Sequence, residues 1–112
     1  MTADSNSTYT VRDLLTHLVE RNGTDLLLSV GQPPQIRLSG NLVSLDFAPL
    51  TQEMAKVLCY QVMSELHQKK FEEEWEVDFS FGIQNVSRFR VNIFNQRGSV
   101  SGAFRRIPFK IL

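Results

Sequence analysis

The strongest constraint on the fold is an alternation of apolar and polar residues that runs through the C-terminal third of the chain. Three segments carry this alternation, and their apolar positions are Val77, Phe79 and Phe81, then Phe89, Val91 and Ile93, then Val100 and Phe104. Successive side chains of a β-strand point to opposite faces, so this period of two predicts three strands, each with one apolar and one polar face. Such strands pair into a mostly antiparallel sheet whose apolar face needs a cover.

Three segments with the apolar spacing of helices supply that cover. The first begins after Thr10, which has Asp13 at the position of a capping box, and it ends near Gly23. Thr51 and Ser64 are the expected N-caps of the second and third helices. The predicted class is therefore α+β, with about three helices packed on one face of a mostly antiparallel sheet.

Shorter strands are predicted between the first and second helices. Residues 24–30 contain three consecutive leucines, which is typical of a buried strand. Residues 35–38 and 42–45 are apolar segments that flank Ser39-Gly40-Asn41, a signal for a hairpin turn. These strands extend the sheet beyond the three of the C-terminal third.

Length and composition describe an ordinary globular domain. Apolar residues make up 42% of the 112 residues and charged residues 21%, which suits a single modest core. We expect a flexible leader over residues 1–9 and one domain over residues 10–112. The single cysteine, Cys59, cannot form an internal disulfide, and this favours a reducing compartment, the cytoplasm.

Charge is distributed unevenly along the chain, although the formal net charge is zero. Residues 88–112 contain no acidic side chain and six basic ones, namely Arg88, Arg90, Arg97, Arg105, Arg106 and Lys110. This segregation indicates either an anionic partner for the C-terminal third or an acidic surface elsewhere in the domain that neutralises it. Charge alone leaves both interpretations open.

The polar face of the last two predicted strands is a candidate anion site. A tight hairpin over residues 95–98 would place Arg88 opposite Arg105, and Arg90 opposite Ala103, on this face. Directly opposed like charges are destabilising unless an anion lies between them. Arginine suits such a site because its planar fork binds two phosphate oxygens and stays charged at every relevant pH.

Two other interpretations of these arginines stay open. Asp78 and Glu76 share the polar face and can pair with Arg88 or Arg90 as cross-strand salt bridges. Binding of nucleic acid is the weaker interpretation, because every Phe in these strands is expected on the buried face, which leaves no aromatic platform for stacking bases.

No catalytic constellation is visible in the sequence. The chain lacks a Gly-rich phosphate loop ending in Lys-Ser or Lys-Thr, so it has no nucleotide cradle and is not expected to be an enzyme by itself. His17 and His67 are expected on the surface, without partners at metal-ligand spacing, so no metal site is predicted. Cys59 is expected to be a buried, unreactive thiol, and Asp25 a turn or capping residue.

Several sequence blocks, taken together, resemble one known family. The blocks are Thr24–Ser29, Gly31-x-Pro33-Pro34 with Arg37-x-x-Gly40, Glu76–Phe81, Arg88–Gln96 and Phe104–Pro108. Their order and spacing resemble the opening of the pilus retraction ATPases of the PilT type, from about residue 11 to the end of the chain. Each block alone is a weak signal, and the combination is specific.

The resemblance implies a PAS-like N-terminal domain that a linker joins to a RecA-like ATPase domain, which is absent from this sequence. Six subunits of that family form a ring at the cytoplasmic face of the inner membrane, where ATP hydrolysis drives pilus retraction and twitching motility. The implied partners are RecA-like ATPase domains of the same and neighbouring subunits and the pilus inner-membrane platform protein, with no nucleic acid. The implied cofactors are ATP and Mg in the full-length protein and none in this chain.

The resemblance also implies which residues act. Arg90 and Arg105 match family arginines that move toward the ATP phosphates when the domains close, and Arg88 and Arg97 are subsidiary candidates. Leu27 stands where the family usually has His, so the role of that imidazole is absent here. Two alternatives stay open, namely a free-standing PAS-like sensor of a small ligand and a protein-interaction module whose arginines bind acidic surfaces.

Overall fold

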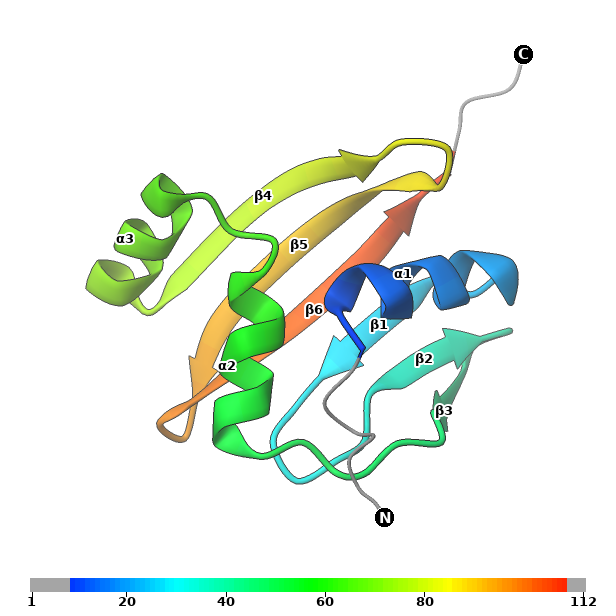
Figure 1. The fold of residues 1–112 in the computed structure, drawn as a ribbon, viewed down its shortest axis with the longest axis horizontal. Coiled ribbons are helices and arrows are strands. Elements are labelled where there is room, and N and C mark those ends of the chain that lie inside the picture. Colours follow the sequence, from blue (N-terminus) through cyan, green and yellow to red (C-terminus); the bar gives the residue numbers. More distant parts are fainter. Residues whose placement is uncertain (1–8, 109–112) are drawn as a thin grey trace.

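The computed structural model describes residues 9–108, so the expected leader lies outside the described residues except for its last position. The helices are α1 (Val11–Glu20), α2 (Gln52–Tyr60) and α3 (Glu65–Glu74), and the strands are β1 (Asp25–Leu28), β2 (Gln35–Leu38), β3 (Asn41–Ser44), β4 (Glu76–Ile83), β5 (Ser87–Gln96) and β6 (Ser99–Ile107) (Figure 1). The predicted α+β class is confirmed. None of these helices is long and apolar enough to cross a membrane.

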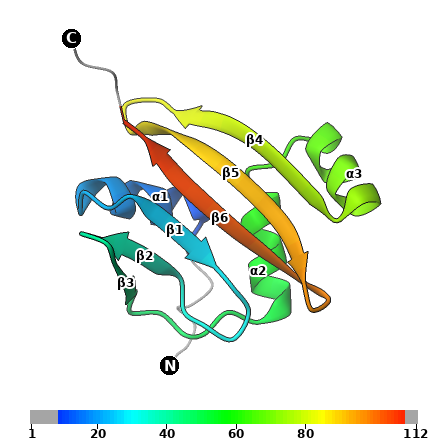
Figure 2. The ribbon, with the colours of Figure 1, turned by 180° about the vertical axis from the view of Figure 1, so that it is seen from behind.

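The six strands form one antiparallel sheet with the order β3-β2-β1-β6-β5-β4. The last strand in sequence, β6, therefore lies between β1 and β5. Helices α1 and α2 lie across one side of the sheet, and α3 lies beside β4 (Figure 1). Within residues 9–108 no helix covers the reverse side (Figure 2), and we call this side the open face.

The helices begin where the sequence predicts, because each has a hydroxyl N-cap. The Thr10 hydroxyl accepts a hydrogen bond from the backbone N–H of Asp13, and the Asp13 carboxylate accepts one from the backbone N–H of Thr10. Thr51 and Ser64 cap α2 and α3 through their hydroxyl oxygens. These caps satisfy amides that have no partner within the helix, so the three helix starts are determined locally.

The core lies between the helices and the sheet. On the sheet side it contains Phe89, Val91, Ile93 and Phe104, each fully buried. Burying an apolar side chain of this size stabilises the folded state by about 1.5–3 kcal/mol. The alternation that predicted the strands thus reflects one face packed against helices and one face open to solvent.

The hairpin between β5 and β6 differs from the predicted register by two residues. Arg90 lies opposite Arg105, and Arg88 lies opposite Ile107, so both predicted pairs, Arg88 with Arg105 and Arg90 with Ala103, are wrong. The turn consists of Arg97 and Gly98, which have φ values of 55° and 81°, as a two-residue turn of this hand requires. A shift of two residues leaves the alternation of faces unchanged, so Arg90 and Arg105 stay on the predicted polar face.

Cys59 lies in α2 and packs against β6. An added Cβ at Gly102 would lie 2.9 Å from the Cys59 Sγ, so the glycine allows the helix to approach the strand closely. The thiol is fully buried, and this burial raises the pKa of Cys59 to about 12. The predicted buried thiol is confirmed.

The protection of this thiol can be measured. At pH 8 the native protein should react with an aromatic disulfide reagent at least about a hundredfold more slowly than the urea-unfolded chain, because the thiolate is the nucleophile. The folded state keeps the proton above the usual pKa of 9.0. The free energy of unfolding should therefore fall as the pH rises from 9 toward 12. Equal reaction rates in the two states would contradict the packing described.

Candidate functional site

Strand register brings charged residues into one line across the open face. Five strands contribute one residue each to this line, which we call the cross-strand row: Ser80 of β4, Arg90 of β5, Arg105 of β6, Asp25 of β1 and Arg37 of β2. Three of these side chains are guanidinium groups and one is a carboxylate. The row therefore concentrates positive charge on the side of the sheet opposite the helices.

Arg90 and Arg105 lie directly opposite each other within the row. The prediction that both belong to the polar face is confirmed. Their side chains are 69% and 72% exposed, so both guanidinium groups reach solvent. Like charges in opposed positions disfavour strand pairing unless an acid or a bound anion compensates them. Two aspartates, Asp78 and Asp25, supply part of this compensation.

Asp78 compensates Arg90 weakly. Its Oδ2 lies 3.4 Å from Nη2 of Arg90, and its side chain is 49% exposed. The cross-strand salt bridge considered from the sequence is thus present for this pair, whereas Glu76 accepts a hydrogen bond from Asn92. An exposed pair of this kind contributes at most about 1 kcal/mol. The contact with Asp78 therefore does little to fix the guanidinium group of Arg90.

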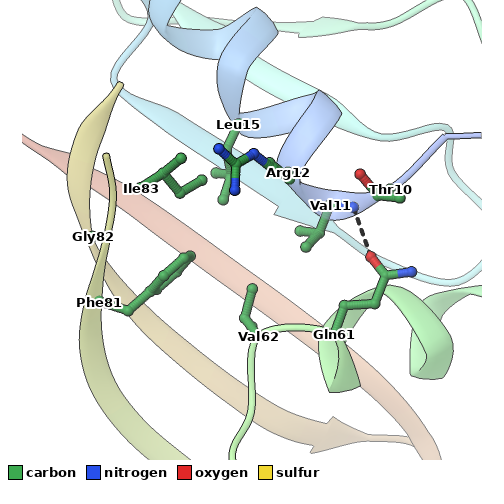
Figure 3. A pocket seen from close by; sticks show the side chains of 9 residues that line it. All are labelled: Thr10, Val11, Arg12, Leu15, Gln61, Val62, Phe81, Gly82 and Ile83. Atoms are coloured by element: carbon green, nitrogen blue, oxygen red, sulfur yellow. Dashed lines mark hydrogen bonds between the residues drawn. The ribbon is translucent and has the colours of Figure 1, made fainter. Parts of the chain in front are cut away.

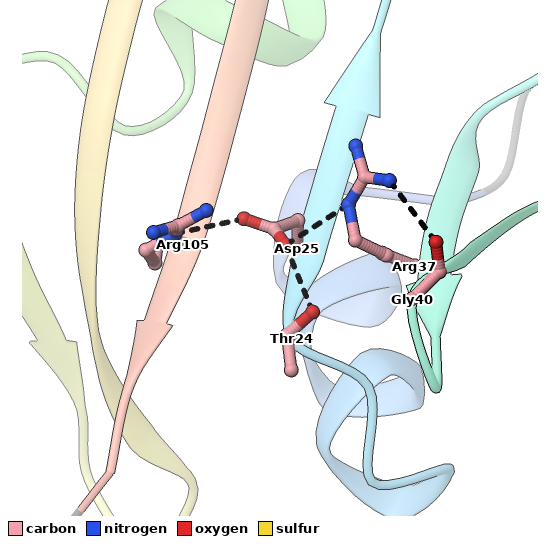
Figure 4. A network of polar contacts seen from close by, with 5 residues as sticks. All are labelled: Thr24, Asp25, Arg37, Gly40 and Arg105. Atoms are coloured by element: carbon pink, nitrogen blue, oxygen red, sulfur yellow. Dashed lines mark hydrogen bonds and ion pairs between the residues drawn. The ribbon is translucent and has the colours of Figure 1, made fainter.

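Asp25 compensates Arg105 more firmly (Figure 4). Its carboxylate accepts hydrogen bonds from the Thr24 hydroxyl at 2.8 Å and from Nε of Arg105 at 3.0 Å, and it lies 3.4 Å from Nε of Arg37. Its side chain is only 11% exposed. The expectation that Asp25 is a turn or capping residue is wrong, because β1 begins at this residue and runs between two strands that carry arginines.

Arg37 is the member of the row that sequence reasoning missed as a site residue. Ile36 is fully buried on the helix side of β2, so the side chain of Arg37 lies on the open face. Its Nη1 also lies 3.5 Å from the carbonyl oxygen of Gly40. The alternation within residues 35–38 was the signal that could have placed it.

The two subsidiary candidates lie at opposite ends of β5. Arg88 lies on the open face, two residues from Arg90, and its side chain packs over Gly82 on the neighbouring strand. A Cβ atom added at Gly82 would lie 3.0 Å from Nη1 of Arg88. Arg97 lies in the turn after β5, seven residues from Arg90, which corresponds to about 23 Å along an extended strand. The structure thus brings Arg88, but not Arg97, near the pair of Arg90 and Arg105.

Two further residues of the hairpin refine the assignment of its faces. Arg106 lies on the helix side, where its Nη1 donates to Oδ1 of Asn22 just beyond the end of α1, a position where the helix dipole favours a cation. Phe94 lies on the open face, half-buried, opposite Glu76 and Ser101. The expectation that every Phe of these strands belongs to the buried face is therefore wrong.

The histidines are less exposed than the sequence suggests. His67 is half-buried, and its ring stacks on Phe79 with 4.2 Å between the ring centroids. His17 is half-buried on α1. His67 is thus less exposed than predicted, because Phe79 covers part of its ring. In the described part of the chain, no three His, Cys, Asp or Glu side chains gather into a group that could hold a metal ion.

A groove of about 600 Å³ lies on the helix side, where α1, the end of α2 and β4 meet (Figure 3). Phe81 and Ile83 form its apolar wall, and Arg12 extends over it from α1. The Gln61 side-chain oxygen accepts a hydrogen bond of 2.8 Å from the backbone N–H of Val11, one of the amides at the start of α1. This hydrogen bond joins the start of α1 to the end of α2 beside the groove. The groove lies on the opposite side of the sheet from the cross-strand row.

The fold and the cross-strand row define an α+β domain, a six-stranded antiparallel sheet with helices on one side and a cationic open face. No family model matches the chain. The chain is 40% identical over 102 residues to the type IV pilus retraction ATPase PilT of Pseudomonas aeruginosa, and 34% identical over 98 residues to the type IV pilus ATPase PilU of the same organism. These alignments cover 91% and 88% of this chain, and they span 30% and 26% of the two relatives.

Solved structures agree with these relatives. A crystal structure of the pilus retraction motor PilT with bound ADP matches with a TM-score of 0.84 and 42% identity, over 93% of this chain and 31% of that one. The Legionella pneumophila ATPase DotB shares the fold, with a TM-score of 0.75 at 19% identity over 95% of this chain and 31% of its own. Over about nine-tenths of its length the chain is therefore homologous to the N-terminal portion of the pilus retraction ATPases PilT and PilU. The resemblance drawn from the sequence blocks is confirmed.

Proposed function

We propose that this chain is the N-terminal domain of a hexameric ATPase motor that powers type IV pilus retraction and twitching motility, and that Arg90 and Arg105 reach the phosphates of ATP. The observation that carries the proposal is the directly opposed, solvent-exposed pair of arginines on the open face. A sheet tolerates such a pair best when an anion binds between the two guanidinium groups.

In this proposal one domain binds the nucleotide and another supplies the arginines that contact its phosphates. This chain has no Gly-rich phosphate loop, so the nucleotide and its Mg²⁺ would be held by a RecA-like ATPase domain of the same or a neighbouring subunit in the ring. Closure of the two domains would bring the arginines to the phosphates, where they stabilise the charge that develops during phosphoryl transfer. The relative crystallised as a pilus retraction motor with bound ADP supports a nucleotide as the ligand.

The proposed location follows from the same assembly. We infer a cytoplasmic motor at the inner face of the inner membrane, in contact with the pilus inner-membrane platform protein. The ATPase names of the relatives and the homology over nine-tenths of this chain support this inference. An interaction module, the competing function, would use the same arginines on acidic protein surfaces without any effect on nucleotide turnover.

The variant Arg90→Ala tests the proposal in the full-length ATPase. We expect kcat for ATP hydrolysis to fall about tenfold, equivalent to about 1.4 kcal/mol of transition-state stabilisation, because one phosphate donor is lost. The matched control is Arg12→Ala, which removes an exposed arginine on the helix side of the sheet. Circular dichroism and the urea midpoint establish that both variants stay folded. Unchanged turnover in the folded Arg90→Ala protein would contradict the mechanism.

A further inference from the structure

We propose that Asp25 is a positioning residue that holds Arg105 by its Nε atom and thereby directs the two terminal nitrogens of that arginine toward a phosphate. The inference rests on the proposed function, since the phosphate is the one that Arg105 is proposed to reach. It adds a buried carboxylate to that site and assigns it a role distinct from charge neutralisation alone.

The carboxylate of Asp25 is itself held in place. It is 11% exposed, and it accepts hydrogen bonds from the Thr24 hydroxyl just before β1 and from Nε of Arg105 on β6. It also forms an ion pair with Nε of Arg37 on β2 (Figure 4). Both arginines are its direct register partners across the sheet. A buried carboxylate requires such partners, so Asp25 is a fixed anchor at the centre of the sheet.

The nitrogen through which Arg105 contacts Asp25 determines which of its nitrogens stay available to a ligand. Arginine has one N–H at Nε and four at its terminal nitrogens, and the terminal fork is the part that matches two phosphate oxygens. Arg105 meets Asp25 through Nε at 3.0 Å, while 72% of its side chain is exposed. The side chain is therefore anchored at its base, and its terminal nitrogens extend toward solvent on the open face.

Arg90 provides an internal comparison. It meets Asp78 through the terminal nitrogen Nη2, at 3.4 Å, and Asp78 is half exposed. Asp78 therefore competes with a phosphate for the same nitrogen, whereas Asp25 does not compete for the fork of Arg105. Of these two opposed arginines, Arg105 is already oriented before a phosphate binds. Arg90 would have to release Asp78 in order to bind the phosphate through the same nitrogen.

Orientation of this kind raises kcat, because a donor already placed at the developing charge needs no reorganisation during the reaction. We expect Asp25→Asn to lower kcat for ATP hydrolysis about tenfold in the full-length ATPase, with the KM for ATP changed less than about twofold. The matched control is Asp46→Asn, an exposed carboxylate in the loop between β3 and α2. That variant should retain the turnover of the wild-type protein.

Combination with Arg105 variants separates positioning from structural support. If Asp25 acts through Arg105, then Asp25→Asn should cause no further loss in an Arg105→Ala background, because residues that act as one unit are not additive. A lysine at position 105 would have a single side-chain nitrogen. Asp25 would bind that nitrogen, so it would not be directed toward the phosphate. Arg105→Lys should therefore be as impaired as Arg105→Ala, and adding Asp25→Asn to Arg105→Lys should raise turnover, a gain that unfolding cannot produce.

Each outcome decides one question. Equal losses from Asp25→Asn with and without Arg105 would overturn the positioning role while leaving the proposed function intact. Full activity of Arg105→Lys would also overturn it, and this variant changes only an exposed side chain, so it decides the matter even if Asp25→Asn does not fold. Wild-type turnover in Arg105→Ala would instead reject Arg105 as a phosphate contact, and the proposed function would fail at that residue.

Discussion

Replacing Arg90 and Arg105 together by alanine should lower kcat for ATP hydrolysis by the full-length ATPase about a hundredfold or more. The two guanidinium groups are directly opposed and exposed on the open face, so a phosphate between them would receive charge-assisted hydrogen bonds from both. Arg90→Ala alone is expected to cost about tenfold, and a similar loss at Arg105 multiplies with it when the two donors act independently. Loss of both donors should therefore exceed the effect of Arg90→Ala alone.

The double variant needs a control that removes the same charge. Arg12→Ala with Lys69→Ala deletes two exposed cations on α1 and α3, away from the cross-strand row, and should change kcat less than about twofold. The urea midpoint of the Arg90 and Arg105 double variant should correspond to a stability within about 1 kcal/mol of the wild-type protein, as for most surface substitutions. Similar turnover in the two double variants would exclude a specific role for the arginine pair.

The second large effect concerns the core. Phe104→Ala should lower the free energy of unfolding by about 4 kcal/mol, because truncating a buried Phe removes apolar burial and leaves a cavity. Phe104 is fully buried on the central strand β6, opposite Val91 on one side and Leu26 on the other. Because β6 is paired with a strand on each side, the sheet can close only partly on the space left by the ring.

Urea unfolding followed by circular dichroism measures this loss. Leu66→Ala is the matched control, since Leu66 is an apolar residue of α3 that is 75% exposed, and its truncation should change stability by less than about 0.5 kcal/mol. A loss of less than about 2 kcal/mol in Phe104→Ala would mean that the site collapses around the missing ring. The packing described for β6 would then be wrong.

The faces of the sheet could be predicted from the sequence because their signal is local. Alternation with a period of two is a property of neighbouring residues, so Phe104 and Arg105 were assigned to opposite faces without knowledge of any partner strand. The helix starts were predictable for the same reason, since a cap such as Thr10 with Asp13 lies within one helical turn. The Arg90 and Arg105 side chains were therefore placed correctly on one face.

The register of the last hairpin could not be predicted, because a shift of two residues leaves the alternation unchanged. What decides between the two registers is the conformation of the turn. Gly98 adopts a positive φ at the second position of the turn, together with Arg97, and this sets Arg90 against Arg105 instead of Ala103.

The role of Asp25 was not predictable because its partners are distant in sequence. The contact between Asp25 and Arg105 joins residues 80 positions apart, and it exists only because β6 pairs with β1. His67 was misplaced for a similar reason, since the helical position alone does not reveal that Phe79 of the next strand stacks on its ring. Local patterns determine faces, and strand order determines which side chains meet.

The position of β6 has a consequence for how the domain is made. The ribosome delivers β1, β2 and β3 before the other strands of this sheet and β6 after them, yet β6 is the strand that joins those three strands to the β4–β5 pair. Until its residues emerge, the three strands β1–β3 and the β4–β5 pair have no strand to connect them, and each group would have exposed edges. Completion of the sheet is therefore a late, long-range event in folding, the kind of step that slows a small domain.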